Sequence, residues 1–146
     1  VKKLCKKYKV KFIINDDPYL AIKLNADGCH LGRKDMKISE ARKILKNKII
    51  GSTCNNSKKL IIESNRNNVD YVALGAFNKS KTKRVKYFAK INLIKWTKNN
   101  FDLPVVAIGG INSSNYKKLL LHKADFLAIS GYLWRNNPSK VIKEFL

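Results

Sequence analysis

Short apolar runs alternate with amphipathic stretches along the chain. The runs occupy residues 10–15, 29–32, 49–53, 70–77, 104–111 and 125–133. Apolar residues adjoin one another in these runs instead of alternating strictly with polar ones, which is typical of strands buried on both faces, as in a parallel sheet. We therefore expect six parallel strands at these positions.

The stretches between the runs carry apolar residues at helical spacing. They cover residues 39–47, 56–68, 91–100 and 113–123, and several open with Ser or Asn, which are favoured N-cap residues. Repeated β-α units fold either as an open doubly wound sheet or as a closed barrel. The loops GSTCNNS (51–57) and GGINSSN (109–115) lack the G-x-G-x-x-G spacing of dinucleotide-binding sheets. The pattern favours a barrel, and no linker divides residues 1–146 into two domains.

A pair of glycines, Gly109 and Gly110, ends the run at 104–111 and is followed by an Asn/Ser cluster that begins a helix. Glycine weakens a strand interior, so the pair indicates a sharp bend or a close approach of another group to the backbone. In (β/α) barrels the active site lies at the carboxyl ends of the strands, and the loops after the last two strands bind phosphate. Polar or glycine residues follow the expected strands at Asn15, Asp16, Asp35, Thr53, Asn55, 80–83, Gly109, Gly110, Ser130 and Gly131.

Charge and cysteine content narrow the class of protein. The formal net charge of +21 would attract nucleic acid, acidic membranes or phosphorylated small molecules. Lysines are spread over every polar segment and no nucleic-acid-binding signature accompanies them, which favours a solvated basic surface. The three cysteines, Cys5, Cys29 and Cys54, are too few and too far apart for a Cys-x-x-Cys metal site or a disulfide framework. With no apolar run of membrane-spanning length and no signal peptide, we expect a cytoplasmic protein.

Six segments together resemble one enzyme family. They are FIINDDPYLA, ADGCHLGRKDM, IIGSTCNNS, DYVALGAFNKSKTK, VVAIGGINSSN and ADFLAISG. Their order and spacing are similar to those of thiamine-phosphate synthases, particularly the alphaproteobacterial form, over essentially the whole chain.

The resemblance implies a (β/α)8 TIM barrel that joins hydroxymethylpyrimidine diphosphate to thiazole phosphate. The products are thiamine phosphate and pyrophosphate, so the enzyme would be a transferase of thiamine biosynthesis. In this family Mg²⁺ assists the departure of pyrophosphate, and the thiazole nitrogen captures the pyrimidine-methyl cation that remains. Positioning and charge neutralisation supply most of such catalysis.

The resemblance also assigns the metal ligands. Asp16 and Asp35 match the family's ligand positions, and two carboxylates facing a diphosphate suit Mg²⁺. Considered without the family, metal ligation and capping are equally favoured, with Asp16 capping the helix that begins near Pro18 and Asp35 capping or flanking the next one. Asn15 matches the Asn that hydrogen-bonds the pyrimidine.

The remaining carried-over positions concern the substrates. Thr53 matches a hydroxyl at the pyrimidine partner, and Lys83 matches the cation at its diphosphate; both are candidate catalytic residues. The substrate-binding stretch 80–83 also contains Lys81, with Ser80 and Thr82 at the thiazole phosphate, although such a stretch is otherwise typical of a basic surface loop. The resemblance implies that Gly110 lets a phosphate approach the backbone, where the amides of Ser130 and Gly131 complete its site.

The sequence departs from the family in several places. The family's first two β-α units, with a Gln-x-Arg-x-Lys segment that grips the diphosphate, are not found before Val1, so we expect about six of eight units and a fragment or truncated gene product. Asp17 stands where Arg is usual, Arg33 where Gln is usual and Asn55 where His is usual. Asp17 adds negative charge beside the expected metal site, and Arg33 would partly compensate for it.

Two other functions stay open at this stage. The first is a related non-synthase barrel, either a thiazole tautomerase or a degenerate phosphate-binding paralogue; the tautomerase is disfavoured because Asn55 occupies its His position. The second is a basic, non-enzymatic nucleic-acid-binding protein, which the net charge alone indicates. We expect His30 and His122 to be structural or surface residues and Trp96 and Trp134 to be packing residues. The oligomeric state is left open.

Overall fold

One sheet of six parallel strands runs through the computed structural model, which describes residues 1–79 and 88–146. The strands lie side by side in chain order, so each β-α unit places its strand next to the preceding one. They are β1 (Ile13–Asn15), β2 (Gly28–Leu31), β3 (Ile49–Asn55), β4 (Tyr71–Gly75), β5 (Val105–Ile108) and β6 (Phe126–Ala128).

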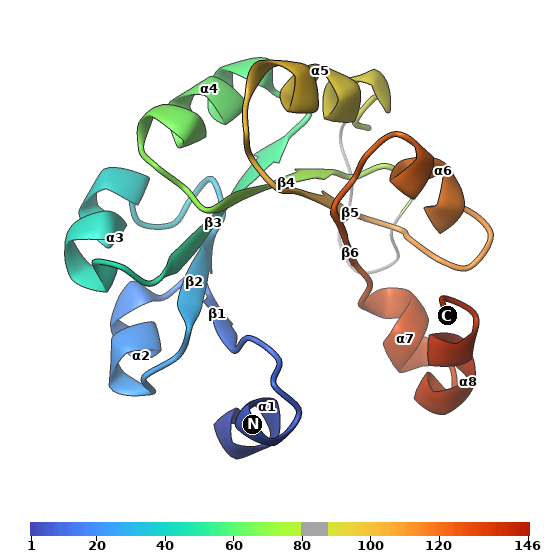
Figure 1. Cartoon of the computed structure of the whole chain (residues 1–146), viewed down its shortest axis with the longest axis horizontal. Coiled ribbons are helices and arrows are strands. Elements are labelled where there is room, and N and C mark those ends of the chain that lie inside the picture. Colours follow the sequence, from blue (N-terminus) through green and yellow to red (C-terminus); the bar gives the residue numbers. More distant parts are fainter. Residues whose placement is uncertain (80–87) are drawn as a thin grey trace.

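Helices cover the outer side of the sheet. The sheet curves into an arc with α2 to α6 on its convex side, while α1 lies near one end of the arc and α7 and α8 near the other (Figure 1). The described residues therefore form a six-stranded half-barrel, where the sequence predicted a (β/α)8 barrel with about six of its units present. The helices are α1 (Lys2–Lys7), α2 (Pro18–Lys23), α3 (Ile38–Leu45), α4 (Lys58–Arg66), α5 (Asn92–Asn100), α6 (Tyr116–Leu121), α7 (Gly131–Arg135) and α8 (Pro138–Lys143).

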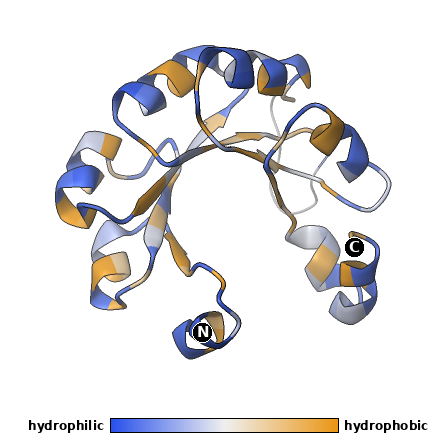
Figure 2. Ribbon diagram, in the orientation of Figure 1, coloured by the Kyte–Doolittle hydropathy of each residue, from blue (hydrophilic) through white to orange (hydrophobic). Residues whose placement is uncertain are grey.

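The core lies between the convex face of the sheet and these helices. Alternate strand residues such as Cys29, Ile50, Val72 and Val105 are fully buried there, and they belong to one apolar cluster with residues of the helices. Figure 2 shows apolar strands with mostly hydrophilic outer helix surfaces. The intervening strand residues face the concave side, where most are only half-buried. We expected both faces of the sheet to be buried. The expectation holds for the convex face, which the helices cover, but not for the concave face.

Three aspartates link the strands in pairs, β1 with β2, β3 with β4 and β5 with β6. Asp27, Asp70 and Asp125 directly precede β2, β4 and β6, and each exchanges two hydrogen bonds with a residue at the start of the preceding strand. The carboxylate accepts that residue's N–H at 2.7–2.8 Å, and the aspartate's own N–H donates to its carbonyl at 2.8–2.9 Å. We call these contacts the reciprocal Asp pairs; their partners are Phe12, Ile50 and Val105.

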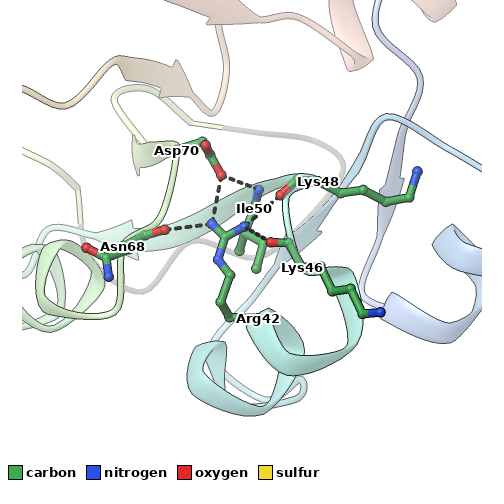
Figure 3. A network of polar contacts seen from close by, with 6 residues as sticks. All are labelled: Arg42, Lys46, Lys48, Ile50, Asn68 and Asp70. Atoms are coloured by element: carbon green, nitrogen blue, oxygen red, sulfur yellow. Dashed lines mark hydrogen bonds and ion pairs between the residues drawn. The ribbon is translucent and has the colours of Figure 1, made fainter.

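A cation accompanies each reciprocal Asp pair, and Arg42 of α3 makes the most contacts (Figure 3). Its guanidinium donates to the carbonyls of Lys46, Lys48 and Asn68 and to the Asp70 carboxylate, at 2.6–2.9 Å. The planar fork of arginine suits several acceptors at once. Arg42 thereby ties the end of α3 to the segments that enter β3 and β4.

The elements agree with the sequence pattern except towards the C-terminus. All six predicted strands are present, but the run at 125–133 is strand only over Phe126–Ala128, because the chain turns into α7 at Gly131. Ser57 caps α4 as an N-cap serine should, accepting from the N–H of Leu60. The residue before α3 is Lys37, which makes no such bond.

The two tryptophans differ. Trp96 packs against the apolar cluster and makes an edge contact with Phe101, as expected. Trp134 lies in α7 with 74% of its surface exposed, so the prediction that it is a packing residue was wrong. Among the described residues, no helix has both the length and the apolar character needed to cross a membrane.

Candidate active site

The carboxyl ends of the strands bring most of the predicted site residues to one edge of the sheet. Parallel strands all end at the same edge, so residues that lie far apart in the sequence become neighbours. Residues 80–83 (Ser80, Lys81, Thr82 and Lys83) lie outside the described residues. The others are Asn15 at the end of β1 with Asp16 after it, Asp35 after β2, Thr53 within β3, Gly110 after β5, and Ser130 and Gly131 after β6.

Asp16 does not cap the helix that follows it. Its backbone has φ of +70°, in the left-handed region, and its N–H donates to the carbonyl of His30 at 2.8 Å. The cap is Asp17, whose side chain accepts from the N–H of Leu20 at 2.9 Å. The capping role considered for Asp16 was therefore wrong, and the unusual Asp17 has a structural role of its own.

Asp35 closes a tight turn after β2. Its Oδ2 accepts from the N–H of Gly32 at 2.6 Å, and its own N–H donates back to the carbonyl of Gly32 at 3.3 Å. The next helix, α3, begins at Ile38 with Lys37 in the cap position, so Asp35 does not cap it. The turn holds this carboxylate at the end of β2, the strand next to β1.

The carboxylates concentrate negative charge at the ends of β1 and β2. Burial, as the largest cause, and the charges of Asp16, Asp17 and Asp35 together raise the pKa of the Cys29 thiol to about 11. Grouped carboxylate oxygens are ligands for a hard divalent cation. No cluster of three or more His, Cys, Asp or Glu side chains suited to a metal ion occurs in residues 1–79 and 88–146. A cation held by Asp16 and Asp35 would therefore need further oxygen ligands from a substrate or water.

Two of the departures from the family meet at one place. Arg33 and Asn55 line the same shallow hollow beside the start of α4. Asn55 has φ of +51°, which asparagine tolerates better than most residues. Arg33 thus brings a positive charge to this end of β2 and β3.

Thr53 belongs to a row of three hydrogen-bonded side chains on the concave face. Its Oγ1 lies 2.8 Å from His30 Nε2, and His30 Nδ1 lies 2.9 Å from the Tyr71 hydroxyl. Burial lowers the pKa of His30, against an opposing effect of Asp35, so the ring is neutral near pH 7. Burial also raises the pKa of Tyr71 to about 12, so the phenol keeps its proton.

The sequence analysis did not predict these hydrogen bonds. It expected His30 to be structural or at the surface, and it assigned nothing to Tyr71. A signal was present, because both are polar residues at inward positions of apolar strands, one strand apart on either side of β3. His122, by contrast, ends α6 and binds the carbonyl of Lys118, as expected of a histidine outside the site.

The backbone conformation of the loop after β5 requires glycine at two positions. Gly109 and Gly110 have φ of +91° and +64°. A Cβ on Gly110 would lie 2.4 Å from the carbonyl oxygen of Lys79, and one on Gly109 would lie 2.2 Å from the Cβ of Ala76. The Asn115 side chain donates to the Gly110 carbonyl at 2.9 Å and fixes the loop. Both positions are therefore restricted to glycine whether or not a phosphate binds.

Ser130 and Gly131 stand where β6 turns into α7. Ser130 precedes the helix, and its carbonyl accepts from the N–H of Trp134 at 3.0 Å. The first N–H groups of a helix have no acceptor within the helix. This turn follows β6, the strand next to β5, whose end leads into the loop of Gly110.

Known proteins share this sequence and arrangement. The family model for thiamine monophosphate synthase matches residues 1–133. A thiamine-phosphate synthase of Pelagibacter ubique (strain HTCC1062) is 61% identical over 143 residues, which are 98% of this chain and 69% of the relative. One from Nitrosospira multiformis is 45% identical over 132 residues, 90% of this chain and 56% of that protein.

Solved structures of known proteins superpose on this fold. A thiamine phosphate pyrophosphorylase from Pyrococcus furiosus superposes with a TM-score of 0.80 at 26% identity, covering 99% of this chain and 73% of that one. A 3-hexulose-6-phosphate synthase superposes with a TM-score of 0.65 at 16% identity, over 87% of this chain and 64% of the other, and shares the fold. The chain thus spans between about half and three quarters of the length of these proteins. From the family match, the high identity and the arrangement of strand ends, this chain belongs to the thiamine monophosphate synthase family.

Proposed function

We propose that the protein joins hydroxymethylpyrimidine diphosphate to thiazole phosphate, forming thiamine phosphate and pyrophosphate. The observation that carries this proposal is the gathering of Asp16 and Asp35 at adjacent strand ends, in a protein of this family. Asp17 caps α2 and Lys37 stands at the cap position of α3, so neither Asp16 nor Asp35 serves as a helix cap. The six units are proposed to be part of a (β/α)8 barrel, which their curvature and outer helices support.

The aspartates would hold Mg²⁺ together with diphosphate oxygens. Their hard oxygen ligands fit this ion, which usually takes one or two carboxylates and completes its shell with phosphate and water. When bound, the metal supplies charge neutralisation to the departing pyrophosphate. The Asp35 turn and the backbone of Asp16 hold the two side chains in place, so little reorganisation is needed during the reaction.

The chain's other residues orient the two substrates. Asn15 and Thr53 lie at the ends of β1 and β3 and would bind the pyrimidine. Lys83, in the stretch that also holds Ser80, Lys81 and Thr82, would place a positive charge on the pyrimidine diphosphate. Fixing two reactants next to each other lowers the entropic part of the barrier.

The thiazole phosphate would bind at the end of β5 and β6. The Gly109–Gly110 backbone and the amides of Ser130 and Gly131 would supply the N–H groups that bind it, which the positive φ values of the glycines and the helix start at Gly131 support. The absence of a side chain on Gly110, which the close approach of Lys79 already requires, would also let a phosphate approach this backbone.

We propose that the protein works in the cytoplasm on small molecules. Its three cysteines are all free thiols, which supports a reducing compartment. Neither a specific nucleic acid nor a membrane partner is part of the proposal.

The first test is Asp35→Asn in the intact protein. Asparagine keeps an oxygen for the Gly32 N–H but removes the charge, so the turn should survive while the metal is held less well. We expect kcat to fall at least a hundredfold and the affinity for thiazole phosphate to change less than twofold, measured by thiamine phosphate formation and calorimetry. The Mg²⁺ concentration for half-maximal rate should rise.

Glu40→Gln provides the matched control, because it makes the same acid-to-amide change at an exposed position of α3. It should leave both quantities unchanged. Equal losses of turnover and thiazole phosphate affinity in Asp35→Asn, or no loss of either, would remove the metal-ligand assignment. Failure of the unaltered protein to form thiamine phosphate would remove the proposed function itself.

A further inference from the structure

Three side chains on three neighbouring strands form one hydrogen-bonded chain across the concave face. Tyr71 of β4 contacts His30 of β2, which contacts Thr53 of β3. The His30 and Tyr71 rings are also stacked, with centroids 5.5 Å apart and planes 22° from parallel. Stacking and hydrogen bonding together fix the imidazole in one orientation.

Tyr71 reaches His30 by crossing over Gly51 of β3. A Cβ on Gly51 would lie 2.0 Å from the Tyr71 Cζ and 2.3 Å from its hydroxyl oxygen. His30 and Tyr71 are both register neighbours of Gly51, so any side chain there would separate them. The missing side chain is what allows strands two apart to share a hydrogen bond.

The directions of these hydrogen bonds follow from the Tyr71 hydrogen. The Tyr71 phenol is half-buried, and its hydrogen favours a protein acceptor where water has limited access. Among the described residues, His30 Nδ1 is the one acceptor in contact with it. A phenol is also a better donor and a poorer acceptor than an aliphatic hydroxyl. Tyr71 therefore donates to Nδ1, which requires the neutral tautomer with hydrogen on Nε2. His30 Nε2–H then donates to Thr53 Oγ1, and Thr53 accepts.

With these hydrogen-bond directions, the hydrogen of the Thr53 hydroxyl has no acceptor in the described part of the chain. We propose that Tyr71 is a positioning residue, which acts through His30 to set the Thr53 hydroxyl as a hydrogen-bond donor to an acceptor nitrogen of a bound heteroaromatic ring. The proposal rests on the proposed function in one respect, namely that the ring is the pyrimidine substrate. The opposite tautomer would make Thr53 donate to His30 and would present only an acceptor to the ring.

The tautomer is measurable without any substrate. In ¹⁵N-labelled intact protein, the ring nitrogen shifts of His30 report which nitrogen carries hydrogen. We expect the Nε2–H form in the unaltered protein at pH 7.5 and loss of this preference in Tyr71→Phe, which keeps the ring and removes the hydroxyl. Finding Nδ1–H in the unaltered protein, or the same tautomer in Tyr71→Phe, would overturn the proposal.

Kinetics test the connection to Thr53. Tyr71→Phe should raise the KM for the pyrimidine diphosphate about fivefold to tenfold, as loss of one oriented neutral hydrogen bond does, while the KM for thiazole phosphate stays unchanged. In a Thr53→Val background the same change should have no further effect, because the two residues act in series. Tyr19→Phe, at an exposed tyrosine of α2, is the control and should change neither KM.

The outcomes are separable. Additive effects of Tyr71→Phe and Thr53→Val would show that Tyr71 does not act through Thr53 and would overturn the proposal. If the unaltered protein formed no thiamine phosphate, the proposed function would fail, and the tautomer measurement would still decide the role of Tyr71.

Discussion

Asp70 is the residue on which the polar contacts below the sheet converge. Its Oδ2 accepts from the N–H of Ile50 at 2.8 Å and from Arg42 at 2.9 Å, while its own N–H returns a bond to the Ile50 carbonyl. Ile50 is fully buried, so its N–H has no ready access to water if the carboxylate is removed. A buried donor left unpaired costs more than an average hydrogen bond contributes.

Asp70→Ala should therefore lower the free energy of unfolding by about 1–3 kcal/mol. The ion pair with Arg42 adds little to this figure, because the Asp70 side chain is 48% exposed. Chemical denaturation of the intact protein would measure the effect. Asp102→Ala, at an exposed aspartate that makes no side-chain hydrogen bond or ion pair with residues 1–79 and 88–146, is the control and should change stability by less than 0.5 kcal/mol. A loss no greater than that of the control would show that the Asp70 pair does not stabilise the sheet.

At the scale of the element, the loop after β5 combines two demands on the same glycines. Its backbone enters the left-handed region twice in succession, and it packs directly on the residues after β4. In the sequence analysis, the resemblance explained Gly110 only by the approach of a phosphate to the backbone. The positive φ of Gly110 and the 2.4 Å separation between an added Cβ and the Lys79 carbonyl oxygen show that the loop itself would have to move.

We now expect Gly110→Ala to lower the melting temperature of the intact protein by at least 4 °C as well as weakening thiazole phosphate binding. A left-handed conformation costs an L-residue about 1–2 kcal/mol, and the contact with Lys79 adds to that cost. Ser114→Ala, in the same loop but at an ordinary backbone conformation, should change the melting temperature by less than 2 °C. A Gly110→Ala protein with unchanged melting temperature would contradict the conformation described for this loop.

The sequence predicted elements well where one local pattern decides them. Apolar runs located all six strands, because a strand that packs under helices needs apolar residues wherever it touches them. The pattern failed at 131–135, where apolar residues continue past β6 into α7 and nothing local separates strand from helix.

Contacts between strands were harder to predict from the sequence. The reciprocal Asp pairs and the chain from Tyr71 to Thr53 depend on register, which brings together residues that are 15 to 41 positions apart. The assignments of Asp16, Asp35 and Thr53 came from resemblance to a family. The structure adds that neither Asp16 nor Asp35 caps a helix, and that Thr53 has a histidine partner.

Over the whole molecule, a large positive net charge coexists with a small negative centre. The net charge is +21, yet Asp16, Asp17 and Asp35 gather at the ends of β1 and β2. A basic surface raises the local concentration of a diphosphate substrate before it meets the site, and salt screens this effect over about 10 Å at 0.1 M ionic strength. Binding and chemistry should therefore respond differently to salt.

We expect kcat/KM for the pyrimidine diphosphate to fall at least threefold between about 0.05 and 0.5 M ionic strength, with kcat changing less than 1.5-fold. Initial rates in sodium chloride at fixed free Mg²⁺ would measure this. Sucrose solutions of matched osmolarity serve as the control for water activity and should have no such effect. A kcat that falls in parallel with kcat/KM would show that salt acts on the reaction step and not on the encounter.

The crossing of Tyr71 over Gly51 also constrains how this sequence can vary. A new methyl group at position 51 would need the volume that the Tyr71 ring already fills, so neither residue can change freely while the other stays. An enlarged side chain on β3 becomes acceptable only after the aromatic ring on β4 is lost, and that loss also removes the partner of His30. We therefore expect relatives that keep the tyrosine to keep the glycine, and a side chain at position 51 to occur only where the aromatic ring is absent.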